Sequence, residues 1–491
     1  MSKSERCLIS AEFTRRQALA VLTAPAAVIP ARAAEAEPDY NERLRPQFHF
    51  SAKRGWTNDP NGLLFYQGEY HMFFQHNPFD VKWGNMTWGH AVSPDMVHWT
   101  QLDHALNPDK MGTMFSGSGV VDWNNTAGLQ KGEEKTIVLI YTAAGGTNPE
   151  SKGQLYTQCI AYSTDRGRTF TKYSGNPVVP NIIGSNRDPK VTWHAPTRQW
   201  VMALFLDSST YGFLSSPDRT KWALMQTISV PKTSECPDFF EIAVENEPGV
   251  KKWVWTGAND NYLVGTFDGK RFIPEVMTQS VHAGTNYYAV QTFSDLPDGR
   301  RVQMAWMSGG QYPGMPFNQQ MSCPYEFQLR KYGYNSYRIF AYPIREIDAL
   351  RGRARTWNDL TVRPGENPLV GLKGDVWDIV AEIEPGTAKE FGFKVRGRKV
   401  HCTVKENARD ITLANGQLSS QLGLQSEKVG LRLLVDRASV EVFGNGGELA
   451  IPTCFLPDEN NLELEFFAAG GAARIVSLSV YPMRSIWRRQ G

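Results

Sequence analysis

Short apolar runs bounded by turn residues recur along the first two thirds of the chain. Residues 63–66 (Leu-Leu-Phe-Tyr) and 70–74 (Tyr-His-Met-Phe-Phe) flank Gln67-Gly68-Glu69, a pattern that predicts a β-hairpin. The uninterrupted apolar stretches 136–141 and 200–205 are typical of strands buried on both faces. Sustained helical periodicity is scarce, so the pattern predicts an all-β body with closely spaced strands, either a barrel, a sandwich or a propeller.

A second strand-rich region follows a change in composition. Residues 344–362 are rich in Arg, Glu and Asp and predict a charged, helical connector. Beyond them, the apolar runs 431–436 and 439–443 flank one turn, and Gly-Asn-Gly-Gly at 444–447 provides another. This spacing predicts a separate β-sandwich over residues 363–487.

The N-terminal segment has the features of an export signal. Arg15-Arg16 precede an apolar, Ala-rich stretch over residues 18–29, and Ala31-Arg32-Ala33 offers a small-x-small cleavage pattern. Paired arginines before a weakly apolar core favour the twin-arginine route, so a periplasmic or secreted protein is expected. The alternative is an amphipathic N-terminal helix, against which Pro25 and Pro30 argue because each removes a helix hydrogen bond.

Charge and composition exclude several function classes. The 491 residues include 52 Lys and Arg against 50 Asp and Glu, a formal net charge of +2. This balance provides no strong field for nucleic acid or anionic lipid, so neither is an expected partner. Apolar residues make up 41% of the chain and aromatic residues 12%, which excludes a disordered protein. Beyond the N-terminus no apolar run approaches the roughly 18 residues that span a bilayer, so a soluble body is expected.

Cysteine usage favours neither a metal site nor a disulfide framework. One of the six cysteines, Cys7, lies in the expected signal, and the others include no C-x-x-C pair. Buried free thiols are therefore expected.

Three acidic residues lie in loops that precede apolar strands. Asp59 stands in Trp-Thr-Asn-Asp-Pro-Asn-Gly, Asp188 in Asn-Arg-Asp-Pro-Lys, and Glu235 between Ser234 and Cys-Pro-Asp-Phe-Phe. Taken alone, the first two are more often turn residues, whereas an exposed turn explains Glu235 less well. If the three loops converge at one end of the β body, their carboxyl groups could serve glycosidic hydrolysis, which needs one carboxylate and one protonated carboxyl group.

Aromatic and amide side chains nearby would complete a sugar pocket. Trp83, Trp88 and Trp306 are candidate stacking platforms for sugar rings. Asn58 and Gln75 are candidates for reading sugar hydroxyls.

The loop around Asp59 resembles the W-x-N-D-P-N-G motif of glycoside hydrolase family 32, the fructan and sucrose hydrolases. Further segments similar to the family follow in its order: 74–78, 83–90, 115–119, 187–189, 235–238 and 314–318. In the second region, residues 434–437 and 440–443 are similar to the family's C-terminal module. The resemblance extends over residues 48–481.

The resemblance implies a five-bladed β-propeller followed by a C-terminal β-sandwich, with the active site in the propeller's central funnel. The expected division is a signal over 1–34, a linker over 35–46, a catalytic propeller over 47–343, a connector over 344–362 and a sandwich over 363–487. No metal or cofactor is implied.

The resemblance also implies residue roles. Asp59 is the expected nucleophile at C2 of a terminal fructosyl unit, Glu235 the acid/base, and Asp188 a transition-state stabiliser oriented with help from Arg187. The positions expected to bind the fructosyl unit are Trp56, Asn58, Gln75, Trp83, Phe115, Ser116, Arg187 and Trp306. A retaining mechanism predicts about 5–5.5 Å between the carboxyl groups of Asp59 and Glu235.

Two positions depart from the family pattern. His282 stands before Gly284 in a segment where relatives carry an acidic residue, and Tyr325 stands where they often have Arg or Cys. Both are expected near the pocket wall, which leaves substrate preference open.

The leading hypothesis is a secreted, exo-acting β-fructosidase that releases fructose from levan, inulin or sucrose. Of the two linkage types, β-2,6 is the favoured one. One alternative is a fructosyltransferase, in which a sugar rather than water intercepts the fructosyl-enzyme. The other is a non-catalytic carbohydrate-binding protein that uses its C-terminal sandwich. The expected partner is thus a fructan or sucrose, and the oligomeric state is left open.

Overall fold

A computed structural model describes residues 40–333, 336–405, 410–458 and 460–487. The expected signal, residues 1–34, lies outside this part of the chain. Strands dominate the described residues, and the helical elements found there are three 3-10 turns at Pro149–Ser151, Arg345–Leu350 and Asn445–Gly447. None of the helices in the described ranges has the length and apolarity needed to cross a bilayer.

Five sheets are found in the described residues of the N-terminal region. Their strands are β1 (Gly55–Tyr66), β2 (Glu69–Asn77), β3 (Thr87–Ser93), β4 (Thr100–Leu106) and β20 (Phe317–Asn318) in the first; β5 (Thr113–Asp122), β6 (Thr136–Ala144), β7 (Thr157–Ser163) and β8 (Thr171–Lys172) in the second; β9 (Arg187–His194), β10 (Gln199–Asp207), β11 (Thr210–Ser216) and β12 (Ala223–Ser229) in the third; β13 (Asp238–Ala243), β14 (Lys251–Thr256), β15 (Asn261–Phe267), β16 (Phe272–Pro274) and β17 (Gln279–Ser280) in the fourth; and β18 (Tyr288–Thr292), β19 (Arg301–Trp306), β21 (Tyr325–Lys331) and β22 (Tyr337–Pro343) in the fifth.

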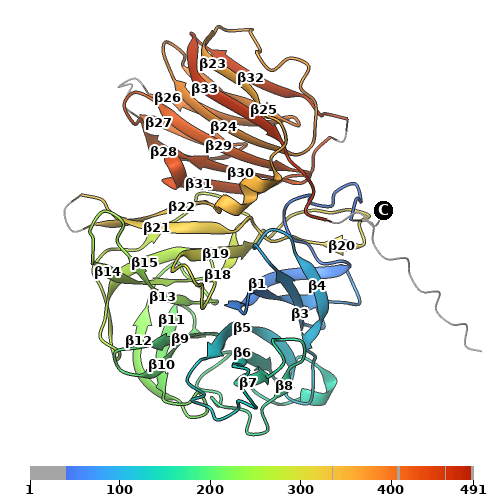
Figure 1. Cartoon of the computed structure of the whole chain (residues 1–491), viewed down its shortest axis with the longest axis vertical. Helices are drawn as coiled ribbons and strands as arrows, with labels where there is room; N and C mark the ends of the chain where they lie inside the picture. Colours follow the sequence, from blue (N-terminus) through green and yellow to red (C-terminus); the bar gives the residue numbers. More distant parts are fainter. Residues whose placement is uncertain (1–39, 334–335, 406–409, 459, 488–491) are drawn as a thin grey trace, which may run out of the picture. The chain divides into compact units, whose positions relative to one another are not determined.

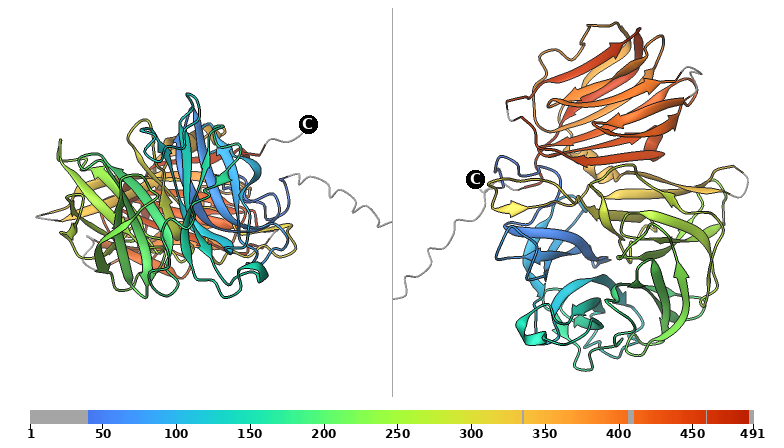
Figure 2. Two further views of the ribbon diagram at one scale, coloured as in Figure 1. Left: turned by 90° about the horizontal axis from the view of Figure 1, so that it is seen from below. Right: turned by 180° about the vertical axis from the view of Figure 1, so that it is seen from behind.

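These sheets form a propeller. Their first strands β1, β5, β9, β13 and β18 each contact the next, and β18 contacts β1, so the ring is closed. Figure 1 and the right-hand view of Figure 2 show the sheets set around a common centre. The late strand β20 pairs in parallel with β1 and joins the first sheet.

The C-terminal region is a sandwich of two sheets. One sheet has the order β23-β33-β24-β29-β30-β31, and the other has the order β28-β27-β26-β25-β32. Their strands are β23 (Arg355–Val362), β24 (Trp377–Glu384), β25 (Glu390–Val395), β26 (Arg398–Val404), β27 (Asp410–Asn415), β28 (Leu418–Gly423), β29 (Val429–Asp436), β30 (Ser439–Gly444), β31 (Leu449–Cys454), β32 (Leu464–Ala469) and β33 (Ala473–Pro482). Both sheets contribute to a single core that includes Ile379, Phe393, Leu433 and Phe466.

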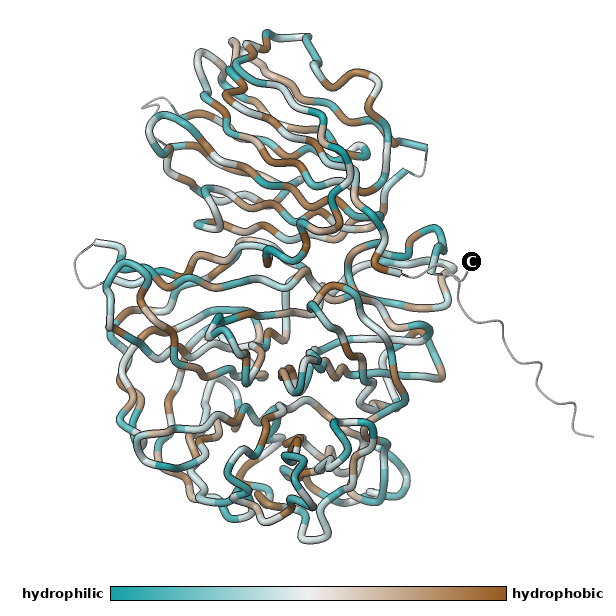
Figure 3. Tube along the Cα trace, viewed as in Figure 1, coloured by the Kyte–Doolittle hydropathy of each residue, from teal (hydrophilic) through white to brown (hydrophobic). Residues whose placement is uncertain are grey.

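The local sequence explains why these strands form. In the hairpin predicted at residues 63–74, Tyr66 pairs with Glu69 across Gln67 and Gly68, which both have positive φ. A two-residue turn of this kind matches the twist of paired strands, and Gly favours it. All nine residues of β6 are buried, as the apolar run predicts. Figure 3 shows hydrophobic and hydrophilic residues alternating along many other strands, as expected for strands with one solvent-facing side.

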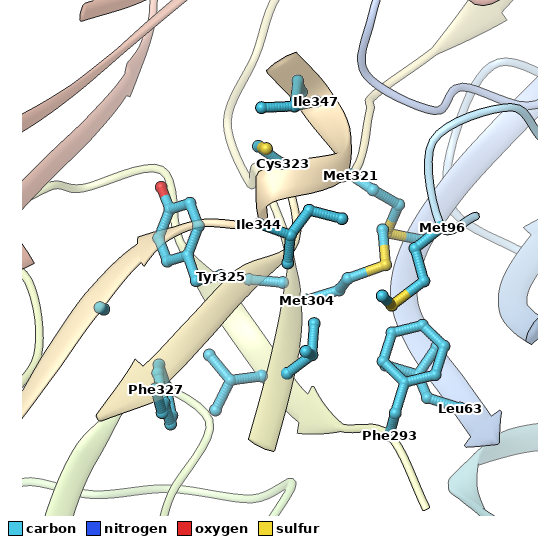
Figure 4. Packing of buried hydrophobic residues seen from close by; sticks show 14 of the residues in the cluster. Leu63, Met96, Phe293, Met304, Met321, Cys323, Tyr325, Phe327, Ile344 and Ile347 are labelled. Carbon is cyan, nitrogen blue, oxygen red and sulfur yellow. The ribbon is translucent and has the colours of Figure 1, made fainter. Parts of the chain in front are cut away.

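A methionine-rich core lies where the first and fifth sheets meet. Met96, Met304 and Met321 are fully buried and pack near Leu63 and Phe293 (Figure 4). Unbranched methionine side chains fill irregular gaps between sheets that meet at an angle.

The structure corrects the prediction of a helical connector over residues 344–362. A short 3-10 helix covers only Arg345–Leu350, and Arg355–Val362 forms β23, which pairs with β33 along the edge of the sandwich. Trp357 and the β-branched residues of this segment suit a half-buried strand. Pairing with β33, more than a hundred residues later, outweighs the helical preference of the arginines.

A buried histidine connects the segment before β1 to the sandwich. His49 Nδ1 lies 2.8 Å from Asp436 Oδ2, and its Nε2 lies 2.6 Å from Glu441 Oε2. Tyr325 of β21 donates a hydrogen bond of 2.6 Å to the other oxygen of Glu441. Burial alone lowers the pKa of His49, but the charges and hydrogen bonds of Glu441 and Asp436 outweigh burial and raise it to about 9.

Candidate active site

A cavity of about 190 Å³ opens where the inner propeller strands begin. The first residues of β1, β5, β9 and β18 and the loop before β13 surround it. Its lining consists of Asn58, Asp59, Gln75, Trp83, Met86, Phe115, Ser116, Arg187, Asp188, Glu235, Tyr288 and Trp306. The structure thus gathers three carboxyl groups from distant segments into one sugar-sized space.

Asp59 lies on β1 and is held by two neighbours. Ser116 Oγ donates a 2.5 Å hydrogen bond to its Oδ2, and Asn58 Nδ2 donates one of 3.0 Å to its Oδ1. Trp56 Nε1 donates to Asn58 Oδ1 at 2.8 Å and so fixes the amide. Burial raises the pKa of Asp59, and the bonds from Ser116 and Asn58 oppose that rise.

Asp188 is the second residue of β9 and is 6% exposed. Its backbone has a φ of +62°, which turns the side chain out of the regular strand direction, and its N–H donates to Thr142 Oγ1 at 2.9 Å. The backbone N–H of Cys236 donates to Asp188 Oδ2 at 3.1 Å. Burial, followed by the charge of Glu235, raises the pKa of Asp188 to about 7, while Arg187 acts in the opposite direction.

Glu235 lies just before β13 in strained backbone. Both Glu235 and Cys236 have positive φ, at 32° and 37°, a conformation uncommon for residues other than glycine. Arg187 donates to Glu235 Oε2 through Nε at 3.1 Å and through Nη2 at 2.8 Å. Tyr288 donates to Oε1 at 2.7 Å. Such strain persists only where surrounding contacts enforce it, and it concentrates at functional sites.

The thiol of Cys236 shows how close two of the acids are. Its Sγ lies 3.7 Å from Asp59 Oδ2 and 3.5 Å from Asp188 Oδ2. One side chain therefore contacts both aspartates. Three carboxyl groups beside one guanidinium, that of Arg187, cannot all ionise without mutual repulsion, so the cluster favours retention of a proton.

Aromatic residues form the walls, with two differences from expectation. Trp83 is 57% exposed at the rim and meets Phe115 edge to face, with ring centroids 6.0 Å apart. Trp56 does not line the cavity but packs edge to face against Trp306 behind it. Trp88, expected as a stacking platform, is fully buried and donates through Nε1 to the Phe115 carbonyl, because its strand β3 faces the core.

His282 and Tyr325 also lie away from the pocket wall, contrary to expectation. Tyr325 is buried and bonds to Glu441, and the partly buried His282 forms an isolated β-bridge with Ala450. Their differences from relatives therefore affect the contact with the sandwich and not the sugar pocket.

Sequence reasoning missed two lining residues, Met86 and Tyr288, and also Cys236, whose thiol contacts Asp59 and Asp188. Each stands inside a segment similar to the family, but no residue-level pattern marks it as a partner of an acid. Among the described residues, no group of three or more His, Cys, Asp or Glu side chains is arranged to hold a metal ion.

Comparisons with known proteins point to one family. The sequence profiles of the Glycosyl hydrolases family 32 N-terminal domain and C-terminal domain match residues 49–343 and 346–482. The levanase of Bacillus subtilis (strain 168) is 39% identical over 493 residues, which cover 91% of this chain and 72% of that protein. The extracellular exo-inulinase of Aspergillus awamori is 28% identical over 522 residues, covering 91% of this chain and 96% of that protein.

Solved structures show the same fold. The crystal structure of exo-inulinase from Aspergillus awamori matches with a TM-score of 0.81 and 27% identity, over 91% of this chain and all of that one. The fructofuranosidase from Schwanniomyces occidentalis complexed with fructose matches with a TM-score of 0.80 and 25% identity, over 91% and 99% of the two chains. This chain, with its N-terminal propeller and C-terminal sandwich, belongs to glycosyl hydrolase family 32.

Proposed function

We propose that this protein is a retaining, exo-acting β-fructosidase that releases fructose from fructans and sucrose. Membership of family 32, with levanase and exo-inulinase relatives, identifies the chain as a fructan-hydrolysing glycosidase. The observation that supports the mechanism is the meeting of Asp59, Asp188 and Glu235 in one cavity of about 190 Å³.

In the first step, an Asp59 oxygen attacks C2 of the terminal fructosyl unit. The bond from C2 to the leaving oxygen breaks, and Glu235 donates its proton to that oxygen. In the second step, Glu235 takes a proton from water, whose oxygen forms the new bond to C2 as the bond to Asp59 breaks. Both residues return to their starting states, and fructose leaves with its configuration retained.

The neighbours of each acid support these roles. Ser116 and Asn58 hold both Asp59 oxygens, which positions the carboxylate for attack. Asp188 faces the same space, and in the described part of the chain its side-chain hydrogen bonds are made by Oδ2, so Oδ1 can accept sugar hydroxyls that strengthen their bonds in the transition state. We expect the carboxyl groups of Asp59 and Glu235 to lie about 5–5.5 Å apart, as retention requires.

The wall residues would position the ring. Trp83, Phe115 and Trp306 offer aromatic faces or edges, and Gln75 offers an amide. A non-catalytic binding protein would not need three acids inside the pocket, two of them, Asp188 and Glu235, in strained backbone, so catalysis is the better explanation.

We further propose β-2,6 linkages as the preferred substrate and export as the destination. The levanase relative supports the first proposal, and relatives named as extracellular enzymes support the second, together with the paired arginines of residues 1–34, which lie outside the described part of the chain.

A product assay tests the proposed function. The purified chain is incubated with levan, inulin, sucrose and raffinose, and free fructose and its initial anomer are followed by chromatography and 13C NMR. Fructose released first as the β anomer is the expected result. Oligofructans at high sucrose concentration would favour transfer, and no release from any substrate, or release with inversion, would overturn the proposal.

A further inference from the structure

A second cavity, of about 220 Å³, lies at the opposite ends of the same inner strands. The active-site pocket takes Ser116 from the start of β5, whereas this cavity takes Val121 from its end. Five residues of extended chain separate the two, or roughly 16 Å at 3.3 Å per residue. β9 and β18 contribute in the same way, through Trp193 and Thr292 near their ends, whereas β13 contributes Phe239 and Phe240 from near its start.

The two cavities are not one continuous channel. Between them, Gln291 Nε2 donates to the Gly117 carbonyl at 2.9 Å, and the Gly117 N–H donates to Asn61 Oδ1 at 3.2 Å. The space left beside these residues is only about 10 Å³, which is less than a sugar needs. A ligand in the second cavity must therefore enter from the other mouth of the propeller.

Three tryptophans line the second cavity. Trp123 is 49% exposed, and its Nε1 donates to Asp295 Oδ1 at 2.8 Å, which fixes the ring. Trp193 and Trp200 pack against each other with ring centroids 5.0 Å apart. A rigid, half-exposed indole presents an apolar face beside polar groups, which is the surface that sugar rings stack on.

The polar lining carries both signs of charge. Lys190, Arg301 and Asp295 line the cavity, and Lys190 already donates to the Thr292 carbonyl at 2.7 Å and pairs with Asp238 at 3.2 Å. The buried Nε of Arg301 has no hydrogen-bond partner among the described residues, although a buried donor without an acceptor is costly. The carboxylate in the wall disfavours an anionic ligand, and the two cationic side chains disfavour a cationic ligand. Sugar hydroxyl groups, in contrast, both donate and accept hydrogen bonds.

We propose that this cavity is a second, non-catalytic binding site for one neutral sugar unit. Its volume matches that of the active-site pocket, which is proposed to hold one fructosyl unit. The choice of a fructosyl unit as the sugar rests on the proposed function. A site on the opposite face from the catalytic acids would hold a second fructan end, or free fructose, without competing for the active site.

Binding stoichiometry tests this inference. The full chain carrying Asp59→Asn, which cannot consume the sugar, is titrated calorimetrically with a β-2,6-linked fructotriose, and we expect two molecules bound per chain. Adding Trp123→Ala removes one aromatic wall of the second cavity, and adding Asn124→Trp places a large side chain at an exposed lining position. Each of these variants should bind one sugar molecule per chain. Ile273→Ala, at another exposed apolar position, is the matched control and should keep two.

The remaining outcomes are decisive. One bound molecule in the parent chain, or two in both cavity variants with unchanged thermal unfolding, would overturn the inference. Inorganic phosphate that binds at the cavity and displaces the sugar would overturn the assignment to a neutral ligand. Wild-type release of fructose from levan is assayed in parallel: no release with two bound sugars would overturn the proposed function alone, and release with one bound sugar would overturn this inference alone.

Discussion

The hydroxyl of Tyr288 lies 2.7 Å from Oε1 of Glu235 and donates a hydrogen bond to it. Arg187 holds the other oxygen of the same carboxyl group through two nitrogens. Both oxygens of the proposed acid/base are thereby oriented from opposite sides, by residues of β18 and β9. Glu235 itself lies in a loop, so its direction depends on these partners.

Tyr288→Phe should lower kcat/KM by about 10–100-fold, because a hydrogen bond to a charged group contributes roughly 1.5–3 kcal/mol. Initial rates on sucrose measure the effect. Tyr287→Phe is the matched control, since its hydroxyl bonds to Gln303 and not to an acid, and its rates should match wild type. Equal losses in both variants would show that the Tyr288 hydroxyl has no special role.

Glu235→Gln should slow hydrolysis of sucrose and levan by about 10²–10⁴-fold, because no proton reaches the leaving oxygen. The formation of the fructosyl-enzyme should be much less affected for a fructoside with a nitrophenol leaving group, which needs no proton. Burst kinetics on both substrate types would measure this difference. A burst rate reduced equally for both would contradict the acid role.

Asp59→Ala should reduce fructose release by about 10⁴-fold or more, because it removes the proposed nucleophile. Added azide should restore part of the activity on the nitrophenyl fructoside and give the inverted fructosyl azide. Product analysis by NMR would identify that compound. Wild-type rates in the variant, or an azide product with retained configuration, would exclude Asp59 as the nucleophile.

Asp188→Asn should abolish activity and yet stabilise the fold at neutral pH. Burial and the charge of Glu235 raise the pKa of Asp188 from 3.8 to about 7, so the folded protein binds the proton more tightly than the unfolded chain. The contribution of this group to stability therefore falls as pH rises from about 4 to about 7. Calorimetry should show a thermal unfolding midpoint a few degrees higher for the variant than for wild type at pH 8, and little difference at pH 4. A difference between the two midpoints that does not change with pH would contradict this.

The protonated His49 should make the free energy of unfolding fall as pH rises into the alkaline range. Its pKa is raised from 6.5 to about 9, so its contribution is complete below pH 6.5 and is lost as pH rises to about 9. His49→Gln should cost about 3–5 kcal/mol at pH 6, because it leaves two buried carboxylates without a cation. Denaturant unfolding between pH 6 and 9 would measure both effects. His98→Gln, at an exposed histidine paired with Asp95, should keep the wild-type slope.

Local pattern predicted the strands whose neighbours in sequence are also their neighbours in the sheet. The β1–β2 hairpin and the buried strand β6 follow from apolar runs and turn residues. The prediction of a helical connector was wrong where β23 forms. The partner of β23, β33, lies far along the chain, and local propensity carries no information about that pairing. The prediction that Trp88 is a stacking platform was wrong for a related reason, since the sequence does not show which face of β3 points to the core.

The three acids of the site could be identified from their loops and from motif order, but their partners could not. The distances from Cys236 Sγ to Asp59 and Asp188 depend on how three sheets approach one another. The position of Tyr288 next to Glu235 depends on the same approach. These relationships arise between elements, so spacing within one segment does not encode them.

The ion pair between His49 and Asp436 joins residues 387 positions apart in sequence. During synthesis, the ribosome has released His49 long before Asp436 and Glu441 exist. The imidazolium therefore has neither of these counter-charges until Asp436 and Glu441 have emerged, and the beginning of the propeller reaches its final packing only after the sandwich strands are made. The order of translation thus makes completion of the propeller depend on prior synthesis of the sandwich strands that carry Asp436 and Glu441.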